Sequence, residues 1–182
     1  MNIKLKAFLI VPPIILTIGT VFALLGIGIC QWAGIPGRLE LGMAVRVGGG
    51  VVLGGGFAFL MWVYAYRRPV DILVSTYISF RKTAMRIPLS EPASRTEPLV
   101  VTGPQRFVRN PMYFAVVVIF IGWWLVLDWT FILFMAGFFT LWFNLVVIPF
   151  EERELRALYG ETFAAYVRAV PRFIPSLRPR WP

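Results

Sequence analysis

Four apolar stretches alternate with short polar segments along the chain, and this pattern predicts the fold. The stretches cover about residues 7–32, 45–66, 113–127 and 129–149. At a rise of 1.5 Å per residue, the last two would each extend roughly 22 to 31 Å, enough to cross or nearly cross the hydrocarbon layer of a bilayer. The pattern therefore predicts an all-α fold, an integral membrane helical bundle of about four transmembrane helices that forms a single domain over residues 1–182.

The segments between the stretches predict how the helices are joined. Residues 1–66 form an N-terminal helix pair, and only Asp128 interrupts the last two stretches, which should therefore form a hairpin with a tight turn. The second stretch contains glycine triplets at 48–50 and 54–56. Gly50 and Gly54 have the spacing of close helix packing in lipid, either within the chain or in a homodimer. A nucleotide-binding loop is the poorer interpretation, because no strand precedes the glycines.

Residues 67–102 are predicted to form a cytosolic connector. Arg67, Arg68 and Pro69 end the second stretch, and residues 70–80 suit an interfacial helix, with their entry into the membrane left open by the sequence. Residues 81–98 are rich in arginine and proline. They suit either an aqueous connector that folds over a site or a plain linker.

The distribution of basic residues predicts the orientation of the bundle. Of the 18 lysines and arginines, only Arg38 and Arg46 would lie at the far end, and the others gather at the end that carries both termini. Positive residues favour the cytosolic side of membrane proteins. We therefore predict an integral, multi-pass membrane protein with both termini in the cytosol.

Composition narrows the possible chemistry. The chain has no histidine and one cysteine, Cys30, which excludes histidine-based triads and a zinc cage and predicts a site without a metal. The net charge of +9 could indicate nucleic acid as a partner, but the basic residues flank apolar spans. Membrane topology explains them, so membrane lipids and not nucleic acid are the expected surroundings.

The first of two polar motifs, GPQRFVRNPMY, precedes the third apolar stretch. Asn110 is a plausible helix cap and Pro111 suits the first helical position, so the helix would direct spare N–H donors at the cytosol. Arg106 and Arg109 add to the preference for an anion such as a carboxylate. A capped helix whose arginines touch lipid phosphates is an equally supported interpretation.

The second motif, EERELRALYGETFAAYVRAVPRFIP, follows the fourth stretch. Glu151 and Glu152 are adjacent carboxylates on an arginine-rich side, and they could attract an ammonium or sulfonium cation. The alternative is a surface pair between Glu152 and Arg156. The rest of the motif predicts an amphipathic helical segment in the cytosol, with Gly160 separating two short helices. Its apolar face would consist of Leu155, Leu158, Tyr159, Phe163 and Tyr166.

Together, the two motifs and the apolar hairpin between them resemble the isoprenylcysteine carboxyl methyltransferase and phospholipid methyltransferase superfamily, whose members are integral membrane enzymes that use S-adenosylmethionine. The resemblance covers about residues 99–175. Asn110 stands where the family usually has histidine, Ala115 where it often has glycine, and Phe163 where it usually has tyrosine. The exchange at Asn110 leaves no imidazole for proton transfer.

The resemblance implies an S-adenosylmethionine pocket at the cytosolic ends of the last two spans, within residues 103–175. Arg172 and Tyr166 are implied for pocket closure or for contact with the substrate. The residues implied for the cofactor site are Gly103, Arg106, Arg109, Asn110, Pro111, Tyr113, Glu151 and Glu152.

The resemblance implies roles that pair each charged group of the cofactor with a residue or helix end of opposite charge. Glu151 or Glu152 would hold the ammonium of the cofactor, Arg109 or the helix end at Asn110 would meet its carboxylate, and Tyr113 would pack on it. Direct displacement at the sulfonium methyl depends mainly on alignment. A carboxylate or thiolate acceptor needs no strong base, whereas an amine must lose a proton. No catalytic residue is assigned by the sequence.

The leading hypothesis is a methyltransferase that acts on a lipophilic acceptor, which could be a prenylcysteine carboxylate, a phospholipid amine or a small hydrophobic thiol. One alternative is an NADPH-dependent membrane reductase of the sterol reductase type, which competition binding with NADPH would reveal. The other is a non-enzymatic membrane subunit with the same fold, which would bind no nucleoside.

Overall fold

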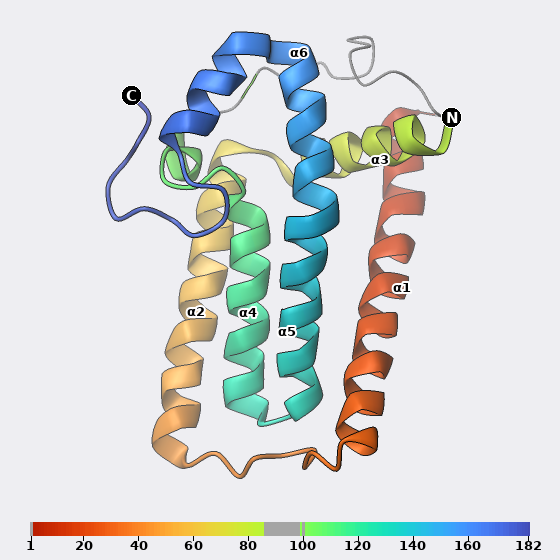
Figure 1. Cartoon of the computed structure of the whole chain (residues 1–182), viewed down its shortest axis with the longest axis vertical. Helices are drawn as coiled ribbons and strands as arrows, with labels where there is room; N and C mark the ends of the chain where they lie inside the picture. The colour runs from red at the N-terminus through yellow and green to blue at the C-terminus, as the bar shows by residue number, and fades with distance from the viewer. Residues whose placement is uncertain (1, 86–98, 100) are drawn as a thin grey trace.

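The computed structural model describes residues 2–85, 99 and 101–182, and all regular structure within these residues is helical (Figure 1). Long helices stand side by side, and one shorter helix, α3, lies across the end where both termini are found. The helices are α1 (Ile3–Trp32), α2 (Met43–Tyr66), α3 (Pro69–Met85), the 3-10 turn η2 (Gly103–Arg106), α4 (Pro111–Leu127), α5 (Thr130–Trp142), the π-helical turn η3 (Phe143–Val147) and α6 (Ile148–Ala169).

The expected all-α membrane bundle is confirmed. Three helical runs are long and apolar enough to cross a membrane: α1, α2 and the continuous run Thr130–Ala169 formed by α5, η3 and α6. The shorter apolar helix α4, with 17 residues, runs beside α2 and α5. Gly160 adopts φ 50° and ψ −125°, so it breaks the long run as the sequence predicted, and the last part of α6 folds back over the bundle end.

The turn between α4 and α5 is as tight as the sequence predicted. Asp128 takes the left-handed conformation at the end of α4, with φ 59°. Its buried carboxylate accepts hydrogen bonds from the amides of Leu39 and Leu41, each at 3.0 Å. The side chain that interrupts the apolar pattern therefore joins this turn to the loop between α1 and α2.

Glycines hold α2 and α4 together, but not the pair that the spacing singled out. A Cβ atom on Gly56 would lie 2.9 Å from the side chain of Ile119, and one on Gly122 would lie 2.7 Å from the backbone of Leu53. Gly50 and Gly54 have open space around their Cβ positions. The two helices therefore approach through other glycines of the same segment, which is the close approach that small residues permit in lipid.

The predicted connector is partly helical. Residues 81–85 continue α3, and Lys82 is 2% exposed, which corrects the expectation that this part is aqueous. The Nζ atom of Lys82 lies 2.8 Å from Oε1 of Glu154 in α6, and this buried ion pair explains how a lysine can leave water. The remaining connector residues, 86–98 and 100, lie outside the described part of the chain.

Candidate functional site

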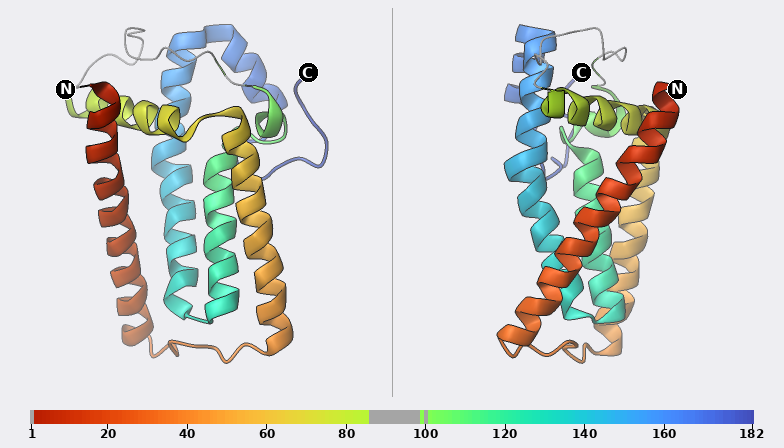
Figure 2. Two further views of the ribbon diagram at one scale, coloured as in Figure 1. Left: turned by 180° about the vertical axis from the view of Figure 1, so that it is seen from behind. Right: turned by 90° about the vertical axis from the view of Figure 1, so that its right-hand side faces the viewer.

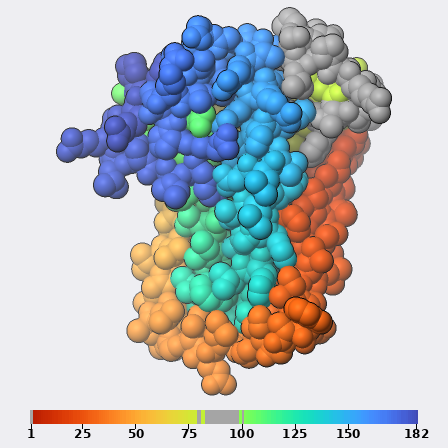
Figure 3. Space-filling view, in the orientation of Figure 1, coloured from red at the N-terminus to blue at the C-terminus, as the bar shows by residue number. Residues whose placement is uncertain are grey.

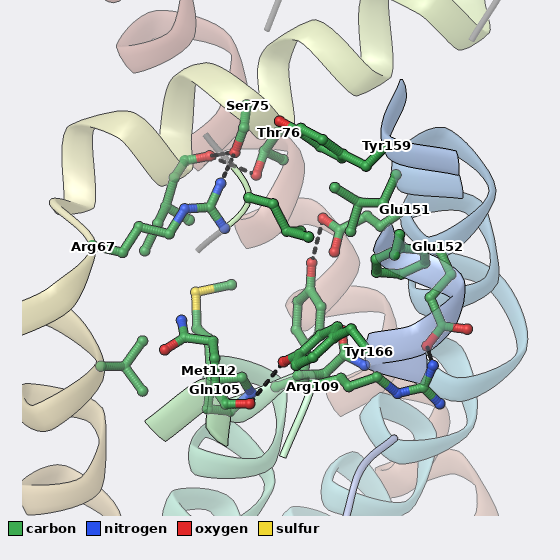
Figure 4. Close-up of a pocket in the computed structure, with 18 residues that line it drawn as sticks. Arg67, Ser75, Thr76, Gln105, Arg109, Met112, Glu151, Glu152, Tyr159 and Tyr166 are labelled. Carbon is green, nitrogen blue, oxygen red and sulfur yellow. Dashed lines mark hydrogen bonds and ion pairs between the residues drawn. The ribbon is translucent and has the colours of Figure 1, made fainter. Parts of the chain in front are cut away.

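A polar cavity of about 100 Å³ lies at the bundle end that carries the termini. Its walls come from the end of α2, from α3, from the link between η2 and α4, and from α6 (Figure 4). The hairpin of α4 and α5 brings residues of both sequence motifs to this cavity. Six of the eight residues implied for the cofactor site line it: Arg109, Asn110, Pro111, Tyr113, Glu151 and Glu152.

The first contact between the motifs joins Tyr113 and Glu151. The hydroxyl of Tyr113 donates a hydrogen bond of 2.8 Å to Oε1 of Glu151. The ring of Tyr113 packs against Phe143, with 4.6 Å between the ring centroids. Phe143 begins the π-helical turn η3, and such turns often occur where a helix adapts to a functional site. The turn thus lies directly before the carboxylates and contacts the tyrosine that faces them.

Glu152 makes the second contact, and both of its partners are arginines. Its carboxylate lies 3.1 Å from Nη1 of Arg109 and 3.1 Å from Nη2 of Arg172. Burial lowers the pKa of Arg109, and the carboxylate of Glu152 opposes this shift. In this structure, Glu152 and Arg109 therefore neutralise one another across the cavity wall, whereas the resemblance implied that each would meet an opposite charge of the cofactor.

The start of α4 is built differently from the prediction. Pro111 occupies the first turn as expected, but the side chain of Asn110 makes no capping hydrogen bond. Its Nδ2 donates instead to the carbonyl oxygen of Arg172, at 2.9 Å. The prediction of Asn110 as a side-chain cap is therefore wrong. Because no side chain caps α4, the first amides of this helix keep their donors for water or an anionic ligand.

Two implied residues, Gly103 and Arg106, lie away from the cavity. Gly103 has φ 58°, and a Cβ atom there would lie 2.6 Å from the ring of Tyr66, so it lets η2 approach α2. Arg106 donates from Nε to the carbonyl oxygen of Trp181, at 2.7 Å. Both residues therefore hold the surrounding framework together, and neither reaches the cavity.

The two residues implied for closure occupy different positions. Arg172 reaches Glu152 from outside, and its side chain is 45% exposed. Tyr166 is buried in the cavity wall, where its hydroxyl donates to the carbonyl oxygen of Gln105 at 2.7 Å. Tyr166 thereby fixes η2 against α6, as Figure 4 shows.

Sequence reasoning missed the wall formed by α2, α3 and η2. Arg67 donates from Nη2 to the hydroxyl of Ser75 at 2.9 Å, and Thr76 lies next to them (Figure 4). Gln105 is buried on the opposite side of the cavity, and its Oε1 has no hydrogen-bond partner within the described residues. The available signal was the pair of hydroxyl residues, Ser75 and Thr76, in a segment that is otherwise apolar.

A second cavity, of about 1080 Å³ and largely apolar, adjoins the polar one. It lies between α1 and the α4–α5 hairpin, because α1 is inclined to the other helices (Figure 2). The two cavities share lining residues, among them Thr76, Tyr113 and Glu151. An amphipathic molecule could therefore lie with its apolar part in the larger space and its polar part beside Tyr113 and Glu151.

Comparison with known proteins identifies the family. The sequence model described as phospholipid methyltransferase matches residues 71–162. This range includes most of α3, the first polar motif, the hairpin, and the second polar motif as far as Thr162. No curated protein and no solved structure matches the chain. The match covers half of the chain and contains most of the residues that line the polar cavity. The chain therefore belongs to the phospholipid methyltransferase family and is a membrane methyltransferase.

Proposed function

We propose that the protein transfers the methyl group of S-adenosylmethionine to a lipophilic acceptor at the membrane surface. The observation that carries the proposal is the junction of the two cavities at Tyr113 and Glu151. A polar cofactor and an apolar acceptor can meet there from opposite sides. We further propose that this bundle end faces the cytosol, because it carries 14 of the 16 lysines and arginines that lie in the described part of the chain.

The polar cavity offers suitable groups for the amino-acid end of the cofactor. Glu151 would hold the ammonium, and the uncapped start of α4 would hold the carboxylate. Two buried atoms, Nε of Arg109 and Oε1 of Gln105, have no hydrogen-bond partner within the described residues, which is expected of a wall that receives a polar ligand. A small-molecule site usually encloses roughly 300 to 1,000 Å³, so we expect the walls to move apart on binding.

The cofactor supplies an electrophilic methyl group on a sulfonium, and the residues of the protein align the acceptor with it. Tyr113 fixes the position of Glu151 through its hydroxyl, and the apolar lining excludes water from the junction. Alignment and exclusion of water provide much of the rate in such a displacement. If the acceptor is an amine, Glu151 or a water molecule would take its proton.

The test is binding of S-adenosylmethionine to the protein in nanodiscs. We expect Glu151→Gln to weaken binding roughly 10- to 100-fold, the effect of losing one charged hydrogen-bond partner. Glu161→Gln is the matched control, because Glu161 lies in the same helix with its side chain 85% exposed. We expect it to bind like the wild type. Transfer of labelled methyl groups into a native lipid extract would then identify the acceptor class.

Two outcomes would contradict the proposed cofactor, and a third would contradict the role of Glu151. Well-folded wild-type protein that binds no S-adenosylmethionine would exclude this cofactor, and displacement of a bound nucleotide by NADPH would favour reductase chemistry. Equal binding by Glu151→Gln and the wild type would remove Glu151 from the cofactor site.

A further inference from the structure

The last twelve residues, 171–182, form a segment without regular structure that is nevertheless fixed to the bundle. We call it the tail segment. The amide and the hydroxyl of Ser176 both donate to the carbonyl oxygen of Phe107, each at 3.0 Å. The amide of Arg180 donates to the carbonyl oxygen of Arg106 at 2.8 Å. The tail segment thus has a defined course along the outside of η2 and the start of α4 (Figure 1).

The side chains of the tail segment divide into two groups. Phe173 and Trp181 face the protein, with ring centroids 6.1 Å from Phe114 and 5.5 Å from Tyr166. Ile174 and Leu177 face outward, with 73% and 101% of their surface exposed. Two large aliphatic side chains thus stand out from an ordered segment, where water would be an unfavourable neighbour. In Figure 3 the tail segment projects from the side of the bundle.

The outward side chains continue the apolar surface of the membrane-spanning bundle. The tail segment lies beside the first turn of α4, next to the end of α2. There, Met61, Trp62 and Tyr66 of α2 are also exposed. Tryptophan and tyrosine concentrate at the interface between hydrocarbon and headgroups. The tail segment is therefore level with an end of α2 that exposes side chains of the kind found at bilayer interfaces.

Basic residues surround the two aliphatic side chains. Arg178 and Arg180 are exposed directly after Leu177, and no acidic residue occurs in the tail segment. An apolar insertion flanked by arginines matches an interface with anionic headgroups. We propose that the tail segment docks on an anionic bilayer surface, with Ile174 and Leu177 in the interface and Arg178 and Arg180 on the lipid phosphates.

Docking would stabilise the wall of the polar cavity. The carbonyl oxygen of Pro171 accepts a hydrogen bond from the amide of Arg109 at 2.9 Å, and that of Arg172 accepts one from Asn110. The guanidinium of Arg172 lies on Glu152. A docked tail segment therefore holds three residues of the cavity wall, Arg109, Asn110 and Glu152, from outside. The effect on the cavity wall rests on the proposed function, because it concerns the same site. Docking itself does not depend on which cofactor binds there.

Depth measurement tests the docking. Leu177→Cys, in a chain that carries Cys30→Ala, would be labelled with bimane and placed in nanodiscs with a shallow spin-labelled lipid as quencher. Glu161→Cys with the same label is the control, because the side chain of Glu161 is exposed in the part of α6 that follows Gly160. We expect at least twofold stronger quenching at position 177 in nanodiscs that contain phosphatidylglycerol. Equal quenching at the two positions would overturn the proposal.

Hydrogen exchange tests the headgroup preference and the link to the cavity without any label. We expect the amides of Arg109 and Ser176 to exchange more slowly in phosphatidylglycerol nanodiscs than in phosphatidylcholine nanodiscs. Each arginine near an anionic surface changes the docked population about 5-fold. The variant Arg178→Gln/Arg180→Gln should therefore lose the difference between the two lipids. Identical exchange of the wild-type protein in both lipids would overturn the preference, and neither experiment requires cofactor binding.

Discussion

The contact between α2 and α4 and the contact between α1 and α5 both join apolar helices, but they are packed differently. Between α2 and α4, Gly56 and Gly122 bring the backbones together so closely that an added Cβ atom would lie under 3.0 Å from a neighbour. Between α1 and α5, only Gly26 meets its neighbours closely, at 3.0 Å from Phe131. Nearer the start of α1, a Cβ atom on Gly19 would lie 3.9 Å from Phe139, and Gly19 lines the apolar cavity.

The difference shows how the molecule can combine a fixed site with an accessible one. The α2–α4 pair fixes the start of α4, where Arg109 and Asn110 form one wall of the polar cavity. The α1–α5 pair diverges and leaves about 1080 Å³ between the helices. A tightly packed pair resists changes of volume, whereas an open space can accept a lipid chain. The following variants test this division, beginning with the largest expected effect.

The buried ion pair between Lys82 and Glu154 joins α6 to α3, the helix that lies across the end of the bundle. We expect Lys82→Met to lower the free energy of unfolding by about 3–5 kcal/mol, because it leaves a buried carboxylate without its lysine. Unfolding in mixed micelles would measure this change. Lys82→Met/Glu154→Leu is the control and should recover most of the loss. A single variant as stable as the wild type would show that α3 is not held to α6 by this pair.

Filling the tightly packed contact is expected to have the next largest effect. Gly122→Ala should lower the free energy of unfolding by about 1–3 kcal/mol, because its Cβ atom would lie 2.7 Å from the backbone of Leu53. Gly48→Ala, on α2 with open space around its Cβ position, is the matched control. We expect it to be neutral or slightly stabilising. Equal effects of the two variants would contradict the difference in packing.

The sequence predicted those features that depend on apolar length and chain connectivity. The apolar stretches define the bundle. Because the turn at Asp128 is short, α4 and α5 must run antiparallel. The ends of the hairpin then meet, which brings Tyr113 to Glu151. The glycine triplets also predicted a close helix contact, but within the chain the contact uses Gly56 and Gly122 and not Gly50 and Gly54. Spacing alone does not determine which face of a helix meets its neighbour.

The features that the sequence did not predict depend on partners far apart in the chain. Lys82 was assigned to water because a lysine among arginines and prolines usually is, and its partner Glu154 is 72 residues away. Asn110 was expected to cap α4, but it bonds instead to the backbone 62 residues later. In both cases tertiary packing brings a partner from a distant part of the chain to the polar side chain. Reasoning from neighbouring residues alone does not include such a partner.

A larger side chain in the apolar cavity between α1 and α5 should affect turnover more than stability. Under the proposed function, we expect Gly19→Leu to lower kcat/KM for the lipid acceptor about tenfold, because the leucine would occupy the apolar cavity. Affinity for the cofactor should not change. Gly28→Leu, on the same helix with open space around its Cβ position, should behave like the wild type. Unchanged kinetics of Gly19→Leu would indicate that the acceptor does not enter between α1 and α5.

Asn110 permits the finest test, because it connects the fixed wall to the tail segment. Losing its hydrogen bond to Arg172 should cost about 0.5–1.5 kcal/mol, near the lower end because the bond is exposed. Asn110→Ala alone does not reveal whether the residue acts as a bridge or as a cap. Asn110→Ser does, because serine caps helices about as well as asparagine does but is too short to reach the carbonyl oxygen of Arg172.

If Asn110 acts as a bridge, the serine variant should be as unstable as the alanine variant, and the amide of Arg109 should exchange faster in both. If it acts as a cap, the serine variant should match the wild type in stability and in exchange. The geometry favours the first result, since the side chain points its Nδ2 donor away from the α4 amides and toward residue 172. The start of α4 would then hold the tail segment with a side chain while its own first amides face the cavity.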